Sequence, residues 1–406
     1  MSDELNRLNR RDFLKTAGGA GLVSLLGSAA AFADPNAPKT QEPNAPAKLE
    51  QVPRRKLGKT GVMVPILNLG GGDFMENQIM LRRAIDWGVS YWDTADCYAN
   101  GNSELGIGKY LDRNPGSRKN IFIVTKSCKK DSVSLQGMLE RSLGRMKTDY
   151  VDLFFLHGVG NPSELTDDAK NWAQKAKQEK KIKFFGFSTH SEMAKCLDAA
   201  AKVDWIDAIM TTYNFREMQN PEMQAAMDAC HKANIGLVAM KTQAKGPSTE
   251  GDKKLVGHFM EKGFTEHQAK LKAVWQDERI ASICSAIPNV AILVSNVAAS
   301  LDKTKLTQAD MDVLKEYAAA TCNGYCAGCA SICGAAMPEA PIRDVMRFVM
   351  YHDSYGSRQL AKEHFAGLDA GVRAKIASLD YTSAEQTCPQ KLPIGRLMRE
   401  AVNKLA

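Results

Sequence analysis

Four side chains suited to proton transfer, Asp93, Tyr98, Lys126 and His157, lie at or just past the ends of apolar runs. The runs have the length and the β-branched or aromatic content of buried strands. They cover residues 89–93, 121–126 and 151–157. In a (β/α)8 barrel the carboxyl ends of the strands converge on one rim, where the chemistry takes place. An Asp, a Tyr, a Lys and a His on such a rim predict a proton-transfer site.

Strand-like and helix-like segments alternate from residue 53 onward, starting with a small hairpin around the glycines of 56–62. Buried strands are expected near 66–70, 91–93, 121–125, 151–156, 183–187, 206–211, 236–240 and 283–286. Eight strand–helix units in roughly 250 residues predict an α/β fold, a (β/α)8 TIM barrel. A doubly wound sheet is the alternative. That fold would be expected to have a G-x-G-x-x-G motif after a strand. The glycines Gly70-Gly71-Gly72 are not followed by that spacing.

Five segments carry a more specific signal. They are Arg55-Lys56-Leu57-Gly58-Lys59-Thr60-Gly61, Asp93-Thr94-Ala95-Asp96-Cys97-Tyr98, Gly101-Asn102-Ser103-Glu104-Leu105-Gly106, Val124-Thr125-Lys126 and Phe155-Leu156-His157-Gly158. The order of these segments resembles that of the aldo-keto reductase family. We assign the corresponding barrel domain to residues 53–305. The resemblance implies redox chemistry on a small carbonyl or alcohol substrate, with Tyr98 as general acid/base.

The chemistry of the four rim residues agrees with that role. Hydride delivery to a carbonyl leaves an alkoxide that must be protonated, and a tyrosine with a pKa of about 10 is a poor acid at neutral pH. The Lys126 ammonium is expected to lower the pKa of Tyr98, because it favours the phenolate. Asp93 is expected to hold Lys126 charged and oriented. His157 is expected to hydrogen-bond the carbonyl oxygen.

The resemblance also implies that NADP(H) binds across the rim. The candidate cofactor-binding residues are Ser188, Thr189, Tyr213, Asn214 and Asn296. Thr189 stands where many family members have Asn, and 287–296 holds no Lys or Arg to grip a 2′-phosphate. Either NADP(H) binds weakly or differently, or another cofactor or electron route is used. Lys241, after the seventh strand, is interpreted as a solvated loop lysine.

The N-terminus resembles a twin-arginine export signal over 1–33. Arg10-Arg11 precedes an apolar stretch rich in Gly and Ala, and Ala31-Phe32-Ala33 has the form of a cleavage site. A basic amphipathic helix start is the alternative. A Pro- and Ala-rich tether follows over 34–52. The twin-arginine export machinery is therefore an expected partner, and the mature protein is expected in the periplasm or elsewhere outside the cytoplasm.

The overall composition is that of an ordinary globular chain: 406 residues, 44% hydrophobic and 24% charged. The net charge of +7 is modest and scattered, and no Lys/Arg run interleaves with aromatic residues. Nucleic-acid binding is therefore not expected. No apolar stretch reaches the roughly 18–20 residues that a membrane span needs.

Five cysteines gather near the carboxyl end, as Cys322-x3-Cys326-x2-Cys329-x3-Cys333 and then Cys388-Pro389. Such spacing lets several thiolates point at one centre, and a Cys-Pro step ends the bacterial ferredoxin pattern. The segment resembles the ferredoxin-like extension of a subset of aldo-keto reductases. That resemblance implies a 4Fe-4S cluster held by Cys326, Cys329, Cys333 and Cys388, with Cys322 as the spare. Zinc and disulfides are the alternatives.

The other cysteines are interpreted as packing residues. Cys97 is expected to be a small packing residue beside Tyr98, although a reactive thiol is the alternative. The rest are expected to be dispersed, mostly core-like thiols: Cys128, Cys196, Cys230 and Cys284.

Two functions of different classes follow. The first is an exported oxidoreductase whose C-terminal region, 306–406, is mostly helical and carries the iron–sulfur cluster. A redox partner protein would then exchange electrons with that cluster. The second is a barrel that has lost turnover and acts as a disulfide-braced periplasmic binding protein. The altered cofactor positions motivate it.

Overall fold

The computed structural model describes residues 49–406 except 245–249, 321–325, 327–329, 354–357 and 389–391. The chain divides into two compact units, Met1–Glu50 and Gln51–Ala406. The proposed export signal and most of the tether lie outside the described residues, as do Cys322 and Cys329. No helix in the described part of the chain is long and apolar enough to cross a membrane.

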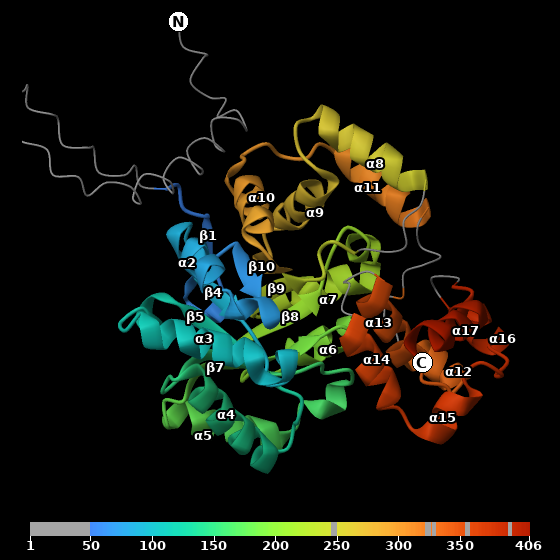
Figure 1. The fold of residues 1–406 in the computed structure, drawn as a ribbon, viewed down its shortest axis with the longest axis horizontal. Helices are drawn as coiled ribbons and strands as arrows, with labels where there is room; N and C mark the ends of the chain where they lie inside the picture. Colours follow the sequence, from blue (N-terminus) through green and yellow to red (C-terminus); the bar gives the residue numbers. More distant parts are fainter. Residues whose placement is uncertain (1–48, 245–249, 321–325, 327–329, 354–357, 389–391) are drawn as a thin grey trace, which may run out of the picture. The chain divides into compact units, whose positions relative to one another are not determined.

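Eight parallel strands close into a barrel in the order β10-β3-β4-β5-β6-β7-β8-β9 (Figure 1). They are β3 (Leu67–Gly70), β4 (Tyr91–Asp93), β5 (Phe122–Ser127), β6 (Val151–Leu156), β7 (Ile182–Thr189), β8 (Ala208–Thr212), β9 (Gly236–Met240) and β10 (Ile280–Ala286). Every neighbouring pair is parallel, including β10 with β3, which closes the ring. The predicted (β/α)8 barrel is therefore confirmed. The doubly wound sheet is wrong.

An antiparallel hairpin, β1 (Arg54–Lys56) with β2 (Met63–Pro65), precedes the barrel, as predicted. Its turn includes η1 (Gly58–Thr60). Gly58 has φ +50°, and a Cβ there would collide with the backbone of Gly236. The residue type is thus fixed by close approach as well as by backbone conformation. Arg55 ties the hairpin to the barrel by donating to the carbonyls of Trp275 and Ile280.

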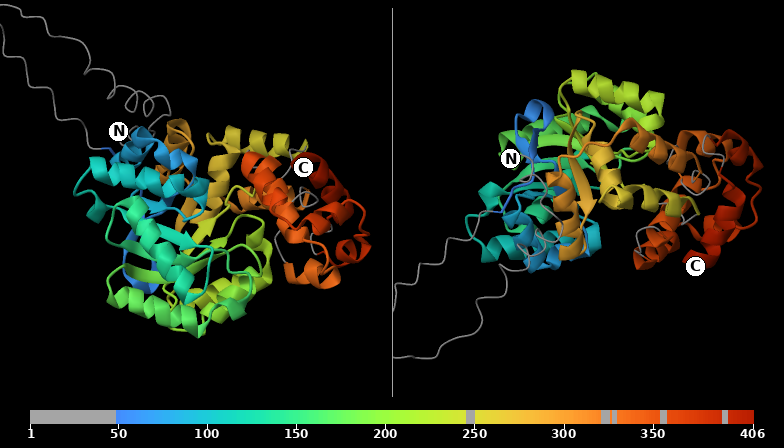
Figure 2. Two further views of the ribbon diagram at one scale, coloured as in Figure 1. Left: turned by 60° about the horizontal axis from the view of Figure 1, so that its bottom comes forward. Right: turned by 90° about the horizontal axis from the view of Figure 1, so that it is seen from above.

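Helices surround the strands (Figure 2). They are α2 (Gln78–Asp86), α3 (Asn102–Arg113), α4 (Ser132–Met146), α5 (Asp167–Gln178), α6 (Met193–Ala200), α7 (Pro221–Lys232), α9 (Glu266–Trp275) and α10 (Val290–Leu301). Polar caps start several of them: Asp131 accepts from Ser134 N at α4, and Thr265 forms a capping box with Gln268 at α9. Such caps satisfy backbone donors that the first helical turn leaves free.

Two further helices, α8 (Glu250–Glu261) and α11 (Gln308–Ala320), pack together beside the barrel. Phe259 of α8 and Leu314 of α11 share one hydrophobic cluster with Phe215, which follows β8. A buried carboxylate joins the pair, because Asp310 of α11 accepts from Lys262 at 2.5 Å. Residues as late in the sequence as α11 therefore pack with barrel helices.

The remaining helices form a group with its own hydrophobic cluster (Figure 1, orange to red). They are α12 (Ala330–Ala336), α13 (Ile342–Asp353), α14 (Arg358–Ala366), α15 (Ala370–Lys375), α16 (Thr382–Thr387) and α17 (Ile394–Leu405). On α17 the residues at a helical spacing, Ile394, Met398 and Ala401, are all buried. The group is helical, as predicted. Helix α13 reaches the barrel, since Arg347 Nη2 donates to the carbonyl of His190 at 3.3 Å.

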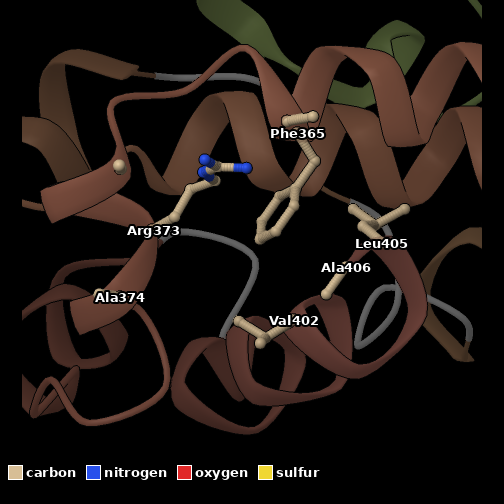
Figure 3. Close-up of a pocket in the computed structure, with 8 residues that line it drawn as sticks. Phe365, Arg373, Ala374, Val402, Leu405 and Ala406 are labelled. Carbon is tan, nitrogen blue, oxygen red and sulfur yellow. The ribbon is translucent and has the colours of Figure 1, made fainter.

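A pocket of about 300 Å³ lies between α14, α15 and α17 (Figure 3). Its lining includes Phe365, Arg373 and Val402, and the chain's last residue, Ala406. None of the sequence-predicted site residues lines this pocket.

Candidate active site

The centre of the site is an ion pair between two neighbouring strands. Lys126 Nζ on β5 donates to Asp93 Oδ1 on β4 at 2.5 Å and to the carbonyl of Thr94 at 2.7 Å. Both residues are 1% exposed. The register of β4 with β5 pairs Asp93 with Val124, so the two residues reach the same rim. Water cannot solvate charges this deeply buried. Their close approach and their hydrogen bonds must therefore offset the cost of desolvation.

Tyr98 lies over this pair. Lys126 Nζ is 4.8 Å from the centroid of the Tyr98 ring. The Tyr98 and His157 rings meet edge to face, with centroids 5.5 Å apart and planes at 78°. The four residues that the sequence singles out therefore lie together at the ends of β4, β5 and β6.

A strained turn and a close backbone approach position the Tyr98 ring. Ala99 and Asn100, which follow it in η3 (Tyr98–Gly101), have φ of 50° and 54° in the left-handed region. Left-handed conformations are uncommon outside glycine and concentrate at functional sites. On the other side, a Cβ added to Gly71 would lie 2.9 Å from Tyr98 Cδ2 and 2.6 Å from the Asp93 carbonyl oxygen. Only glycine fits there without displacing one of them.

The electrostatics differ from the expectation in one respect. Burial raises the pKa of Tyr98 well above its ordinary value, and the negative charge of Asp93 acts in the same direction. The expected lowering of the Tyr98 pKa is therefore wrong, because desolvation of the phenolate is the largest effect. Burial also raises the pKa of Asp93, against the opposing effect of Lys126. The phenol is the stable form of Tyr98.

Two cysteines also meet His157. Cys97 Sγ is 3.3 Å from Cys128 Sγ, and His157 Nδ1 is 3.3 Å from Cys128 Sγ and 3.7 Å from Cys97 Sγ. The hydrogen bond from Cys97 lowers the pKa of Cys128 to about 4, with His157 acting in the same direction, and that bond raises the pKa of Cys97. Both residues are exposed. Cys128 is a free thiol, as expected, but it is exposed rather than core-like and it adjoins Cys97.

The aldo/keto reductase family model matches residues 67–319, from the first barrel strand through most of α11. The chain belongs to the aldo/keto reductase family. Among curated relatives, the aldo-keto reductase yakc [NADP(+)] of Schizosaccharomyces pombe is 28% identical over 218 residues, which are 48% of this chain and 62% of the relative. The chain thus spans less than two thirds of that relative's length.

Solved aldo-keto reductase structures have the same fold. The thermostable Tm1743, solved with the inhibitor epalrestat, superposes with a TM-score of 0.57 at 26% identity, covering 65% of this chain and 99% of that structure. The holo form of AKR11C1 from Bacillus halodurans gives 0.55 at 22% identity, covering 66% and 96%. In both cases about a third of this chain lies outside the match.

Two cofactor candidates, Ser188 and Thr189, are the last residues of β7, and both already have hydrogen-bond partners. Ser188 Oγ accepts from the backbone N–H of Gly158 at 3.0 Å. Thr189 Oγ1 donates to the carbonyl of Ser191 at 2.9 Å. These bonds fix the loop after β7 and leave the Ser188 hydroxyl proton available to a ligand.

The candidates after β8 have structural bonds as well. The Tyr213 hydroxyl donates to Asp277 Oδ2 at 2.6 Å, and its ring is 1% exposed. Asn214 Oδ1 accepts from the backbone N–H of Arg216 at 3.0 Å, and its Nδ2 donates to the carbonyl of Lys241 at 3.2 Å. Asn214 therefore ties the segment after β8 to the end of β9, while Tyr213 ties that segment to the residues before β10.

The remaining cofactor candidate, Asn296, lies on α10, which follows β10. Asn296 Nδ2 donates to Ser285 Oγ at 3.1 Å, which joins α10 to that strand end. Asn289 caps α10 by accepting from Ile292 N at 3.0 Å. The helix N-terminus offers a partial positive charge. The segment 287–296 adds no Lys or Arg to it.

Lys241, at the end of β9, is not the solvated lysine that the sequence suggested. Its Nζ is buried and has no hydrogen-bond partner among the described residues. Burial lowers its pKa well below the ordinary value, the charge of Arg347 adds to this, and Cys326 opposes it. The charges of Arg347 on α13 and of Cys326 therefore both act on this lysine.

Helix α13 brings further residues to the rim that sequence reasoning missed. Tyr351 is one of the groups whose charge raises the pKa of Tyr98. Arg347 bonds to the carbonyl of His190, and burial followed by the charges of Lys241 and Arg347 lowers the pKa of His190 well below its ordinary value. No local motif marks these positions. The amphipathic pattern of α13 predicts a packed helix but not the surface that it meets.

Proposed function

We propose that this member of the aldo/keto reductase family interconverts small carbonyl compounds and alcohols, with Tyr98 as the general acid/base. The observation that carries the proposal is the buried Lys126–Asp93 ion pair beside the Tyr98 ring. It joins a proton donor to a fixed positive charge that stabilises the donor's conjugate base. His157 lies edge-on to Tyr98 and supplies a second hydrogen-bonding group.

The chain's own residues would carry the proton. During carbonyl reduction Tyr98 would protonate the oxygen that becomes the alcohol, as a general acid. The Lys126 ammonium would stabilise the phenolate that is left, and Asp93 keeps that ammonium in place. Because burial favours the neutral phenol, Tyr98 stays protonated until the substrate oxygen develops charge. Alcohol oxidation would use the same groups in reverse.

NADP(H), when bound, would supply the hydride. Two buried rim oxygens, Ser191 Oγ and Thr212 Oγ1, have no hydrogen-bond partner in the part of the chain that the structure describes. A nicotinamide carboxamide offers both a donor and an acceptor, and so it suits them together with Ser188. At the other end the backbone N–H groups of α10 are suited to a phosphate. Since no Lys or Arg lies in 287–296, we expect little preference for NADPH over NADH.

A 4Fe-4S cluster held by Cys326, Cys329, Cys333 and Cys388 forms part of the same proposal. Three of these cysteines are described, and Cys326, Cys333 and Cys388 pack against one hydrophobic cluster although up to 62 residues separate them in the sequence. A cubane cluster needs four thiolate ligands and would supply one-electron transfer. Iron and acid-labile sulfide in anaerobically purified protein would support it; zinc at those cysteines, or disulfides there, would contradict it.

Export by the twin-arginine machinery, and electron exchange with a redox partner protein, complete the proposal. Replacing Arg10 and Arg11 with Lys together should leave the precursor in the cytoplasm. The matched control is Arg7→Lys, which changes a nearby arginine outside the pair. Export of the double variant at the normal level would contradict the assignment of 1–33 as a twin-arginine signal.

Tyr98→Phe tests the assigned chemistry. The variant keeps the ring and removes the transferable proton, so carbonyl reduction across an aldehyde and ketone panel should fall about 10²–10⁴-fold in kcat with nucleotide affinity unchanged. Tyr110→Phe is the control, because Tyr110 packs against Trp92 away from the rim. Unchanged turnover in Tyr98→Phe would contradict the proposal. A wild-type protein with neither turnover nor nucleotide binding would favour the disulfide-braced binding protein instead.

A further inference from the structure

Three metal-ligating atoms converge beside Tyr98 from three successive strand ends. Cys97 follows β4, Cys128 follows β5 and His157 follows β6. Cys97 Sγ, Cys128 Sγ and His157 Nδ1 all lie within 4.8 Å of one another. The proton-transfer chemistry described above requires neither thiol.

The backbone fixes this convergence. The Asp96 N–H donates to the carbonyl of Lys126 at 3.1 Å, next to Cys97. The His157 N–H donates to the carbonyl of Ser127 at 2.8 Å, next to Cys128. Each ligand therefore adjoins a residue that is tied to the neighbouring strand, and no loop has to move to bring the three atoms together.

The distances between these atoms match a tetrahedral zinc centre. With Zn–S of about 2.3 Å and Zn–N of about 2.05 Å, tetrahedral angles place two sulfurs about 3.8 Å apart and a sulfur and a nitrogen about 3.6 Å apart. The observed S–S distance is 3.3 Å and the two S–N distances are 3.3 and 3.7 Å. All three agree to within about half an ångström. A disulfide would need the two sulfurs to approach to about 2.05 Å.

We propose that Cys97, Cys128 and His157 bind a zinc ion whose fourth coordination position is open beside Tyr98. Thiolate sulfur and imidazole nitrogen are common ligands of Zn²⁺. Mg²⁺ and Ca²⁺ prefer oxygen ligands, which this site does not offer. Three protein ligands with an open position are typical of catalytic rather than structural zinc. Both cysteines are exposed, so water or the oxygen of a small ligand can reach the ion.

The site also determines which His157 nitrogen carries a proton. Zinc on Nδ1 leaves the proton of a neutral imidazole on Nε2. Nε2 is then a hydrogen-bond donor, as the proposed contact with a substrate oxygen requires. Zinc binding and that contact are therefore compatible, although the binding proposal stands without any turnover.

Zinc stoichiometry and zinc-edge X-ray absorption test the site in the full chain. Protein purified anaerobically with its C-terminal cysteines loaded with iron is treated with ZnCl₂ and then freed of excess metal. We expect one zinc per chain, coordinated by two sulfurs, one nitrogen and one further light atom. Cys97→Ser/Cys128→Ser should lose this zinc, and the control Cys196→Ala/Cys230→Ala should keep it. The control removes two buried thiols elsewhere.

Several outcomes would overturn the proposal. Zinc surrounded by four sulfurs would belong to the C-terminal cysteines. Zinc retained by Cys97→Ser/Cys128→Ser would place it elsewhere. A chain without zinc, in which peptide mapping finds a disulfide between Cys97 and Cys128, would make the pair a redox couple. The wild-type absorption spectrum decides the coordination even if the double variant folds poorly, and neither measurement depends on reductase activity.

Discussion

Lys126 Nζ lies 2.5 Å from Asp93 Oδ1, and each residue is 1% exposed. The carbonyl of Thr94 accepts a second hydrogen bond from the same ammonium. Removing one partner from a buried pair leaves the other charge uncompensated in a poorly solvated site. The resulting loss of folding free energy exceeds the net contribution of the intact pair to stability. The pair is therefore expected to act as a unit in both stability and turnover.

Asp93→Asn should lower kcat for carbonyl reduction about 10²–10³-fold, because Lys126 loses the carboxylate that keeps it charged and oriented. Steady-state kinetics and thermal unfolding would be measured together, and the midpoint of unfolding should also fall. Asp198→Asn is the matched control, since Asp198 pairs with Lys202 on the exposed surface. Equal effects of the two substitutions on turnover would contradict the role of Asp93.

The pH dependence of turnover should show the raised pKa of Tyr98. Carbonyl reduction needs the protonated phenol, and a pKa above the ordinary value keeps it protonated, so kcat should not fall between about pH 6 and 9 on account of Tyr98. Alcohol oxidation needs the phenolate, and its rate should rise with pH across that range. An alkaline loss of reductase activity near pH 8 that is absent from Tyr98→Phe would show that Lys126 outweighs burial.

Gly71→Ala should reduce activity through a displaced Tyr98 ring. An added Cβ would lie 2.6 Å from the Asp93 carbonyl oxygen and 2.9 Å from Tyr98 Cδ2, closer than van der Waals contact allows. We expect kcat to fall at least about tenfold, as misplaced catalytic groups lose much of their effect. Gly137→Ala is the control, because nothing lies within 4 Å of a Cβ at that position. A fully active Gly71→Ala would mean that the ring tolerates the shift.

The barrel and its four rim residues could be predicted because both depend on local sequence. A continuous apolar run of strand length indicates a strand that is buried on both faces of a parallel sheet. A reactive residue at the end of such a strand lies on the rim of a parallel barrel. Asp93, Lys126 and His157 follow that rule directly. Tyr98 follows from the family resemblance, since its left-handed turn has no sequence signature beyond Gly101.

The rest of the site depends on contacts between distant segments. In the sequence Cys97 and Cys128 are 31 positions apart and show no relationship. In the fold they follow neighbouring strands, and their sulfurs are 3.3 Å apart. Lys241 resembles a loop lysine in the sequence because the groups whose charges act on it, Arg347 and Cys326, lie about 106 and 85 positions later. The direction of the Tyr98 pKa shift likewise depends mainly on how deeply the phenol is buried. The extent of that burial cannot be predicted from the sequence.

Glu217→Gln should stabilise the protein at alkaline pH and have little effect in acid. Burial raises the pKa of Glu217 from 4.5 to about 7, against the charge of Arg216. Between those values the folded state binds more protons than the unfolded state, so stability is complete below about pH 4.5 and falls as pH rises to about 7. Gln stays neutral and avoids a loss on the order of 3 kcal/mol. Thermal midpoints at pH 5 and 8, with exposed Glu222→Gln as the control, would measure this; a gain equal at both values would contradict it.

Lys241→Met should lower the reduction potential of the proposed 4Fe-4S cluster. Burial lowers the pKa of Lys241, but the charge of Cys326 opposes this, and the negative charge of a cluster would act in the same direction as Cys326. A lysine kept charged in this way favours the reduced form, because the cluster and its thiolates become more negative on reduction. Removing the charge should shift the potential negative by on the order of 60 mV, a tenfold change in the one-electron equilibrium. Redox titration followed by electron paramagnetic resonance would measure it. Lys202→Met, which removes an exposed lysine, is the control. A potential that stays the same in Lys241→Met would mean that Lys241 carries no charge when the cluster is present.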